Sequence, residues 1–214
     1  MNKKNRSGLY ALIILFIGIT LCSARNINIV KFIDEAVIKY ETGFTVNTTL
    51  VMWNRMLDNP CLMGKLWELY EFSPAYRINH KDSGFYVIDP TGIEGNLHLI
   101  LSSSTGRIYY GTGSMKNWGL PVTFRGKALF RLHHISSDDN VTVTLHIYGE
   151  GGDTLITDLL LKAVSPILRM YIDRRITRNL RDLKIIIADI MNNPDKIRAG
   201  LSGETLKNFN QLYN

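Results

Sequence analysis

The sequence contains only two cysteines among its 214 residues, Cys22 and Cys61. Cys22 lies in a segment that we expect to be removed, and Cys61 alone cannot form a disulfide within the mature chain. Internal repeats and low-complexity tracts are also missing, and no stretch is poor enough in apolar residues to predict disorder. These absences exclude a disulfide-stabilised scaffold, a repeat protein and an intrinsically disordered chain.

Residue sets that are typical of enzymes and metal sites are equally scarce. No Ser-His-Asp or Cys-His set can be assembled from the spacing of these residues. His133 and His134 are neighbours on an expected strand, so they point to opposite faces, and we expect both to be solvated. Residues 111–116, GTGSMK, lack the glycine spacing and the following helix of a phosphate-binding loop. The sequence therefore predicts no metal and no cofactor.

Much of the positive charge belongs to the N-terminus. Lys3, Lys4 and Arg6 are three of the 25 basic residues, so 22 basic and 19 acidic residues remain, a net charge of +3. Nucleic-acid binding calls for a clustered basic patch with interleaved aromatic residues, and a basic pI that comes partly from the N-terminal segment is poor evidence for one. We therefore expect no nucleic-acid partner.

The first 24 residues have the layout of a secretory signal. Basic residues precede an uncharged apolar run, 9–21, and small residues at Cys22 and Ala24 favour cleavage after Ala24. An uncleaved anchor is the alternative, because the uncharged segment 7–24 is just long enough to span a bilayer. Either form predicts an exported or membrane-anchored protein at the cell envelope.

About 190 residues remain, enough for one domain, which we place at 25–193 with a tail at 194–214. A first strand is expected at 35–44. Two short helices should follow: one runs to Asp58 after a cap at Thr48 or Thr49, and the other covers 61–72.

From Tyr76 to Glu150 apolar residues recur at every second position. This period predicts strands joined by short turns, hence an antiparallel meander. The expected strands are 75–81, 84–89, 93–102, 106–114, 121–135 and 140–150.

After Gly151 and Gly152 the apolar spacing becomes helical and continues until Pro194. This long C-terminal helix contains Pro166, which we expect to kink or divide it. The tail is expected to form at most one further short helix.

This order of elements resembles the helix-grip fold of the superfamily that contains START lipid-transfer domains, Bet v 1-like proteins and polyketide cyclases. The resemblance covers about 35–190 and is carried by GLPVTFRGKALFRL (119–132), NVTVTLHIYGEGG (140–152) and the long helix. It implies an α+β protein in which a curved antiparallel sheet of about seven strands surrounds the C-terminal helix, with two short helices after the first strand. It also implies an apolar cavity between the sheet and the helix.

Gly126 and Ala128 are small where a strand packed only for stability would carry branched residues. We therefore expect both in the cavity wall, unless the helix fills the sheet and leaves no cavity. The expected ligand-binding residues are Phe124, Gly126, Ala128, Phe130, Val143, Leu145, Ile147, Leu160, Val164, Ile167, Leu168 and Tyr171.

Two further groups are ambiguous. Asp89 and Glu94 would suit acid-base catalysis if they faced an apolar pocket, but acids beside Pro90 more often belong to a turn. The basic run 169–184 predicts either a solvated helix face or contact with an anionic membrane.

The leading hypothesis is a non-enzymatic protein that binds or transports a lipid or another hydrophobic small molecule at the cell envelope. A cyclase or isomerase that acts on a hydrophobic substrate is one alternative. A scaffold with a filled interior that binds an envelope protein is the other.

Overall fold

The computed structural model describes residues 27–90, 92–116, 123–151 and 155–214. The chain divides into two compact units, Met1–Glu35 and Ala36–Asn214. In the first unit the structure describes one short helix, α2 (Ile29–Glu35). The expected signal segment lies outside the described residues, so its cleavage stays a prediction. Within the described ranges, no helix is long and apolar enough to cross a membrane.

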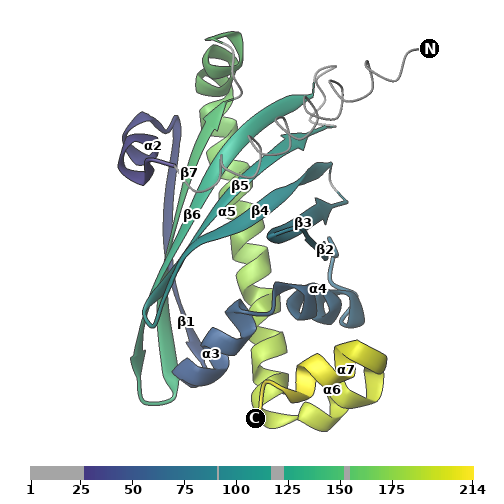
Figure 1. Cartoon of the computed structure of the whole chain (residues 1–214). Helices are drawn as coiled ribbons and strands as arrows, with labels where there is room; N and C mark the ends of the chain where they lie inside the picture. The colour runs from purple at the N-terminus through teal and green to yellow at the C-terminus, as the bar shows by residue number, and fades with distance from the viewer. Residues whose placement is uncertain (1–26, 91, 117–122, 152–154) are drawn as a thin grey trace, which may run out of the picture. The chain divides into compact units, whose positions relative to one another are not determined.

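The second unit is built on a curved antiparallel sheet of seven strands, in the order β1-β7-β6-β5-β4-β3-β2 (Figure 1). Consecutive strands from β2 to β7 pair with each other because their connections are short. The strands are β1 (Ile38–Asn47), β2 (Arg77–Lys81), β3 (Gly84–Asp89), β4 (Ile93–Ser103), β5 (Gly106–Met115), β6 (Phe124–Ser137) and β7 (Asn140–Gly151).

The six strands of the meander lie where the alternating pattern predicts them. β1 begins at Ile38 instead of Glu35, because Glu35 is still the last residue of α2. β1, the first strand in the sequence, pairs with β7, the last one.

Two short helices follow β1, as expected. α3 (Leu50–Leu57) begins at Thr49, whose side chain accepts a hydrogen bond of 3.2 Å from the backbone N–H of Met52. α4 (Pro60–Leu69) begins one residue before the expected range 61–72, at a proline. Proline suits this first position because it needs no hydrogen-bond partner for its nitrogen.

The long helix α5 (Leu155–Asn192) continues through Pro166. Of the two alternatives, a division at Pro166 is therefore wrong, and a kink there stays a prediction. An internal proline removes one backbone hydrogen bond, and helical bonds on both sides remain. Side-chain bonds also hold α5 to other elements: Tyr40 donates to Asp173 at 2.9 Å, and Tyr70 to Asp189 at 2.6 Å.

Two short helices complete the chain, α6 (Pro194–Gly200) and α7 (Gly203–Asn210), where at most one was predicted. Ile197 of α6 and Phe209 of α7 are both fully buried. The break between the helices allows each of them to turn an apolar side chain inward.

The register of the strands determines which residues share a face of the sheet. Tyr40 of β1 and Asp89 of β3 both bond to α5, so the face that carries them is turned toward this helix. We call it the inner face. On β6 it carries Ala128 and Phe130, and on β7 it carries Ile147, which pairs with both Tyr40 and Phe130.

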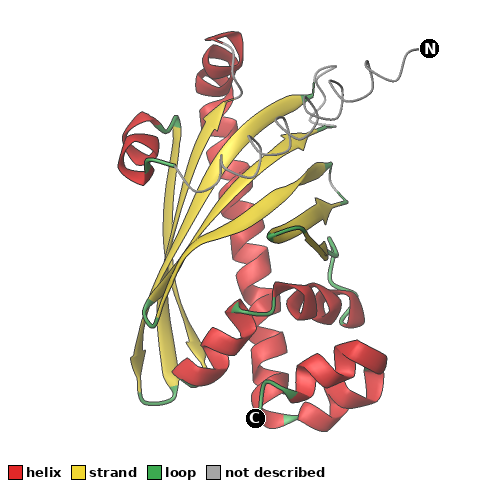
Figure 2. Cartoon of the chain, in the orientation of Figure 1, coloured by secondary structure: helices red, strands yellow, loops and turns green. Residues whose placement is uncertain are grey.

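The hydrophobic core occupies one end of the inner face, where α3, α4, α6 and α7 gather around the C-terminal part of α5 (Figure 2). Its buried members are Val46, Met52, Trp53, Met56, Leu62, Leu66, Trp67, Val141, Val143, Ile186, Ile187, Ile190, Ile197, Phe209 and Leu212. The strand order and the long C-terminal helix together are those of the helix-grip fold.

Candidate ligand-binding site

Small residues form two neighbouring rows across the inner face, beyond the core. In the first, the glycine row, successive strands β4 to β7 pair glycine with glycine: Gly95, Gly113, Gly126 and Gly151. In the second, the small-residue row, the paired residues are Gly111, Ala128 and Gly149. The small residues noticed on β6 therefore belong to a patch that crosses several strands.

The glycine row is required by the backbone of the sheet. A Cβ atom on Gly113 would lie 2.6 Å from the carbonyl oxygen of Glu94, and one on Gly126 would lie 3.0 Å from that of Glu150. A side chain is not tolerated at the distance found for Gly113, and at Gly126 the neighbouring strand would have to shift by a few tenths of an ångström. Glycine thus lets neighbouring strands approach closely and the sheet curve, so Gly126 is small at least partly for a structural reason.

The small-residue row has a different character. A Cβ atom on Gly111 would meet Leu97 Cδ1 at 3.5 Å and Phe130 Cε2 at 3.6 Å, which are ordinary contact distances. The backbone does not force glycine at this position. A small side chain would fit there in ordinary contact with Leu97 and Phe130.

Apolar side chains around these rows are only half-buried, although they lie on the face turned toward α5. At the core end of the same face, Val46, Val141 and Val143 are at most 2% exposed. The half-buried residues are Phe85, Val87, Leu97, Ala128, Phe130, Leu145 and Ile147. We call this set the open part of the inner face, because apolar surface there is not fully covered by protein.

The structure brings most of the predicted strand residues together. Gly126, Ala128, Phe130, Leu145 and Ile147 share the inner face. The fully buried Val143 belongs to the core and leaves no surface for a ligand. On α5, Leu168 is buried and Tyr171 half-buried. The side chains of Phe124, Leu160, Val164 and Ile167 lie outside the described part of the structure.

A polar cluster joins α5 to strand β3 and to the residue before β2. It consists of Tyr76, Asp89, Arg175 and Asn179. Arg175 Nη2 pairs with Asp89 Oδ2, and Arg175 Nε donates to the Tyr76 hydroxyl at 2.7 Å. Burial raises the pKa of Tyr76, although hydrogen bonds from Asn179 and Arg175 oppose the shift. Sequence reasoning placed Arg175 within a solvated basic run and missed this contact.

Glu94 faces the opposite side of the sheet. Its carboxylate accepts hydrogen bonds from Lys116 at 3.0 Å and from Tyr86 at 3.1 Å, and the bond from Lys116 is the main reason that its pKa is lowered. The catalytic alternative, which needs a raised pKa in an apolar pocket, is therefore wrong for Glu94. An outer hollow of about 430 Å³ lies here, lined by Tyr86, Glu94, Gly95, Asn96, Thr112, Gly113, Ser114, Arg125, Gly126 and Lys127.

His134 is also placed differently from the prediction. It is fully buried, whereas its neighbour His133 is exposed. Its Nε2 lies 3.0 Å from the carbonyl oxygen of Ser104, and burial lowers its pKa. In the part of the chain that the structure describes, no three residues are grouped so that they could hold a metal ion.

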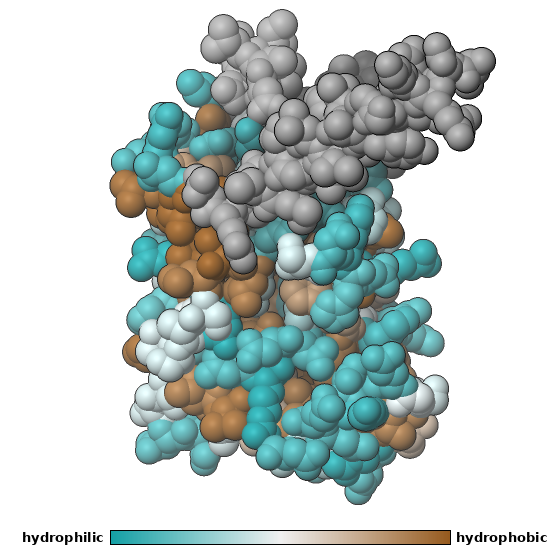
Figure 3. Space-filling model, in the orientation of Figure 1, coloured by the Kyte–Doolittle hydropathy of each residue, from teal (hydrophilic) through white to brown (hydrophobic). Residues whose placement is uncertain are grey.

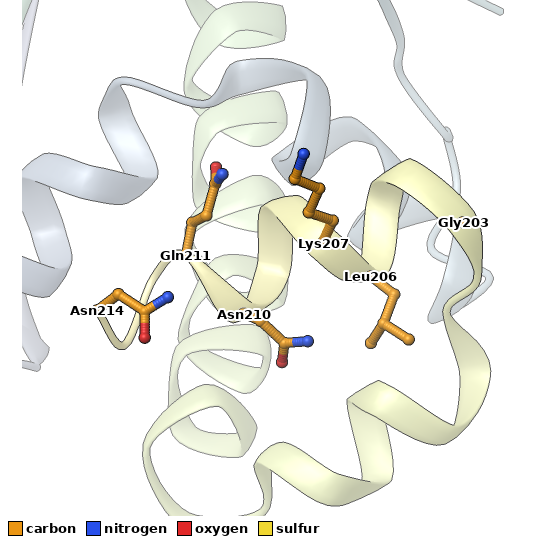
Figure 4. Close-up of a pocket in the computed structure, with 6 residues that line it drawn as sticks. All are labelled: Gly203, Leu206, Lys207, Asn210, Gln211 and Asn214. Atoms are coloured by element: carbon orange, nitrogen blue, oxygen red, sulfur yellow. The ribbon is translucent and has the colours of Figure 1, made fainter.

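Another hollow, of about 420 Å³, lies beside α7. Figure 4 shows that its lining consists largely of polar side chains on this one helix and the residues after it. Figure 3 shows hydrophobic residues scattered among hydrophilic ones on the face turned toward the viewer. Neither feature combines apolar surface with buried polar groups as the inner face does.

The chain thus has the helix-grip fold with an incompletely covered apolar inner face. No family model and no curated protein matches its sequence. Among solved structures, it is similar to a START superfamily protein from Mycobacterium smegmatis, with 6% identity and a TM-score of 0.46 over 71% of this chain and 98% of that one.

Two other solved structures are similar in the same way. A conserved protein from Geobacillus kaustophilus has 12% identity and a TM-score of 0.46, and the match covers 71% of this chain and 96% of that one. Ara h 8.0201 has 12% identity and a TM-score of 0.39, and the match covers 59% and 90%. Similarity at this level concerns the fold alone, and it does not indicate which ligand or activity this chain has.

Proposed function

We propose that this protein binds a hydrophobic small molecule against the open part of the inner face, between the sheet and α5. The observation that supports this proposal is the contrast within one face: full burial at the core end, and half-buried apolar residues around the small-residue row. Contact between apolar surface and water is unfavourable in free energy, and a bound apolar molecule would remove this surface from water.

Burial of the ligand's carbon atoms would supply most of the affinity, about 0.8 kcal/mol for each methylene group removed from water. Acid-base catalysis is a weaker interpretation. Glu94 lies on the outer face, and Asp89 is already paired with Arg175. We therefore favour binding or transport over a cyclase or isomerase reaction.

The proposed place of action is the cell envelope, reached through the N-terminal segment 1–24. The exposed face of α5 supports contact with an anionic membrane, because it carries several basic residues together with exposed apolar ones. This mixed face contains Met170, Arg174, Arg178, Arg181, Lys184, Ile185 and Met191.

Native mass spectrometry of the purified protein tests the proposal. A co-purifying hydrophobic molecule, released on denaturation, is the expected result. A chain that carries no such molecule and takes up none when long-chain alcohols, fatty acids and polycyclic compounds are offered would contradict it. In that case a stable complex with another envelope protein would favour the scaffold.

A further inference from the structure

The polar cluster contacts the core through Tyr76, and Asp89 places it beside the open part of the inner face. Asp89 follows the half-buried Val87 by two residues on β3, so both lie on the inner face. On α5, Arg175 and Asn179 precede the core residue Ile186 by two to three turns. A ligand on the open part of this face could therefore reach the cluster with one end.

The cluster has hydrogen-bonding capacity that the protein does not use. The buried oxygen Oδ1 of Asn179 has no partner among the described residues. The hydroxyl of Tyr76 accepts two hydrogen bonds of 2.7 Å, from Arg175 and Asn179, and with the amide in this orientation its own hydrogen is available to a further partner. Buried polar groups without partners are costly, so a bound group that satisfies them gains affinity.

The charges of the cluster are already balanced. Asp89 is 6% exposed and Arg175 15%, and they form a direct ion pair. A ligand carboxylate placed here would lie beside the carboxylate of Asp89 with no further cation in the cluster to compensate it. The cluster therefore selects against an anionic group.

A hydroxyl group matches the unused atoms. It can donate to Asn179 Oδ1 and accept from the hydroxyl of Tyr76 at the same time. If the Asn179 amide turns its NH₂ group outward instead, a hydroxyl can accept from that group equally well. An uncharged alcohol thus satisfies either orientation of the amide, which a purely apolar end cannot do.

We infer that the polar cluster binds the uncharged hydroxyl head of an amphipathic ligand, such as a long-chain alcohol, whose apolar body lies on the open part of the inner face. This inference rests on the proposed function, because it assigns one end of the same ligand. It adds the chemical class of the ligand and the residues that select it.

The test measures displacement of the uncharged fluorescent probe N-phenyl-1-naphthylamine from the full chain by tetradecane, 1-tetradecanol and tetradecanoate. The alcohol should bind about tenfold more tightly than the alkane, as expected for buried hydrogen bonds that would otherwise stay unmade. It should also bind more tightly than the carboxylate. In Tyr76→Phe the advantage of the alcohol over the alkane should disappear, and in Asn179→Leu it should decrease, while alkane binding stays unchanged.

Tyr40→Phe is the matched control, because it removes another hydroxyl that joins the sheet to α5. It should leave the preference for the alcohol intact. Equal binding of alcohol and alkane by the unmodified protein, or a preference for the carboxylate, would overturn the inference while the proposed function stands. Failure to bind the probe and all three compounds would overturn the proposed function itself.

Discussion

Ala128 of β6 lies directly opposite Gly149 of β7, on the face of the sheet that is turned toward α5. Only one methyl group stands above the backbone of this pair. Side chains on a sheet extend perpendicular to it, so a larger residue at position 128 would project into the space between sheet and helix.

Ala128→Phe should therefore reduce uptake of a hydrophobic fluorescent probe by about tenfold or more, since a phenyl ring fills the volume that the ligand needs. Titration of the probe measures this effect, and thermal unfolding checks that the variant is folded. Arg131→Phe adds the same ring on the exposed outer face of β6 and should bind normally. Unfolding of Ala128→Phe alone would indicate a filled interior instead.

The C-terminal half of α5 provides a test of the core with two adjacent isoleucines. Ile186 is 0% exposed and lies in the core, whereas Ile185 is 43% exposed. Ile186→Ala should lower the free energy of unfolding by about 2–5 kcal/mol, because it leaves a cavity. Ile185→Ala should change it by less than about 0.5 kcal/mol. Urea denaturation measures both values, and similar losses in the two variants would contradict the assigned packing.

His134 should make stability dependent on pH. Burial lowers the pKa of its imidazole below the ordinary value of 6.5, so the unfolded chain takes up the proton first as the pH falls. The contribution of His134 to the free energy of unfolding should therefore be fully present above pH 6.5 and should be lost as the pH falls below this value. The loss should be about 1.4 kcal/mol for each unit between the folded and unfolded pKa values.

Free energies of unfolding at pH 7.5 and 5.5 measure this effect. The loss between these pH values should be smaller in His134→Gln and unchanged in His133→Gln, which alters the exposed neighbour. An equal loss in all three proteins would mean that other groups cause it.

The mixed face of α5 should bind membranes that contain anionic lipid. The form that begins at Arg25 should sediment with vesicles containing phosphatidylglycerol, should bind pure phosphatidylcholine much less, and should lose binding as salt is added. Arg174→Glu with Arg181→Glu should weaken sedimentation severalfold. Lys207→Glu with Arg131→Glu makes the same change of charge on α7 and on the outer face of β6, and it should have little effect. Equal losses would indicate attraction by net charge alone.

Most of the fold could be predicted from the sequence because its signals are local. Alternation of apolar residues between Tyr76 and Glu150 placed six strands, and a cap at Thr48 or Thr49 and the apolar spacing of 61–72 placed the two short helices. Pro166 misled the prediction, because the cost of a proline inside a helix depends on what holds the helix elsewhere.

The candidate site was only partly predictable because it depends on contacts between distant residues. Gly126 and Ala128 could be noticed on one strand, but their glycine partners on β4, β5 and β7 follow from the register of hairpins. Asp89 and Arg175 are 86 positions apart in the sequence, and no local pattern links them. His134 appeared polar and solvated, because its burial depends on the core that forms beside it.

The position of the core at one end of the sheet has a consequence for dynamics. Amide hydrogens exchange with solvent through local opening wherever few buried apolar contacts resist it. The strand segments around Gly95 and Gly113 lie outside the core, whereas the part of α5 around Ile186 lies within it. The glycine-rich end of the sheet should therefore exchange its hydrogens through small openings that leave the core intact, and the same openings would provide a bulky ligand with a way in.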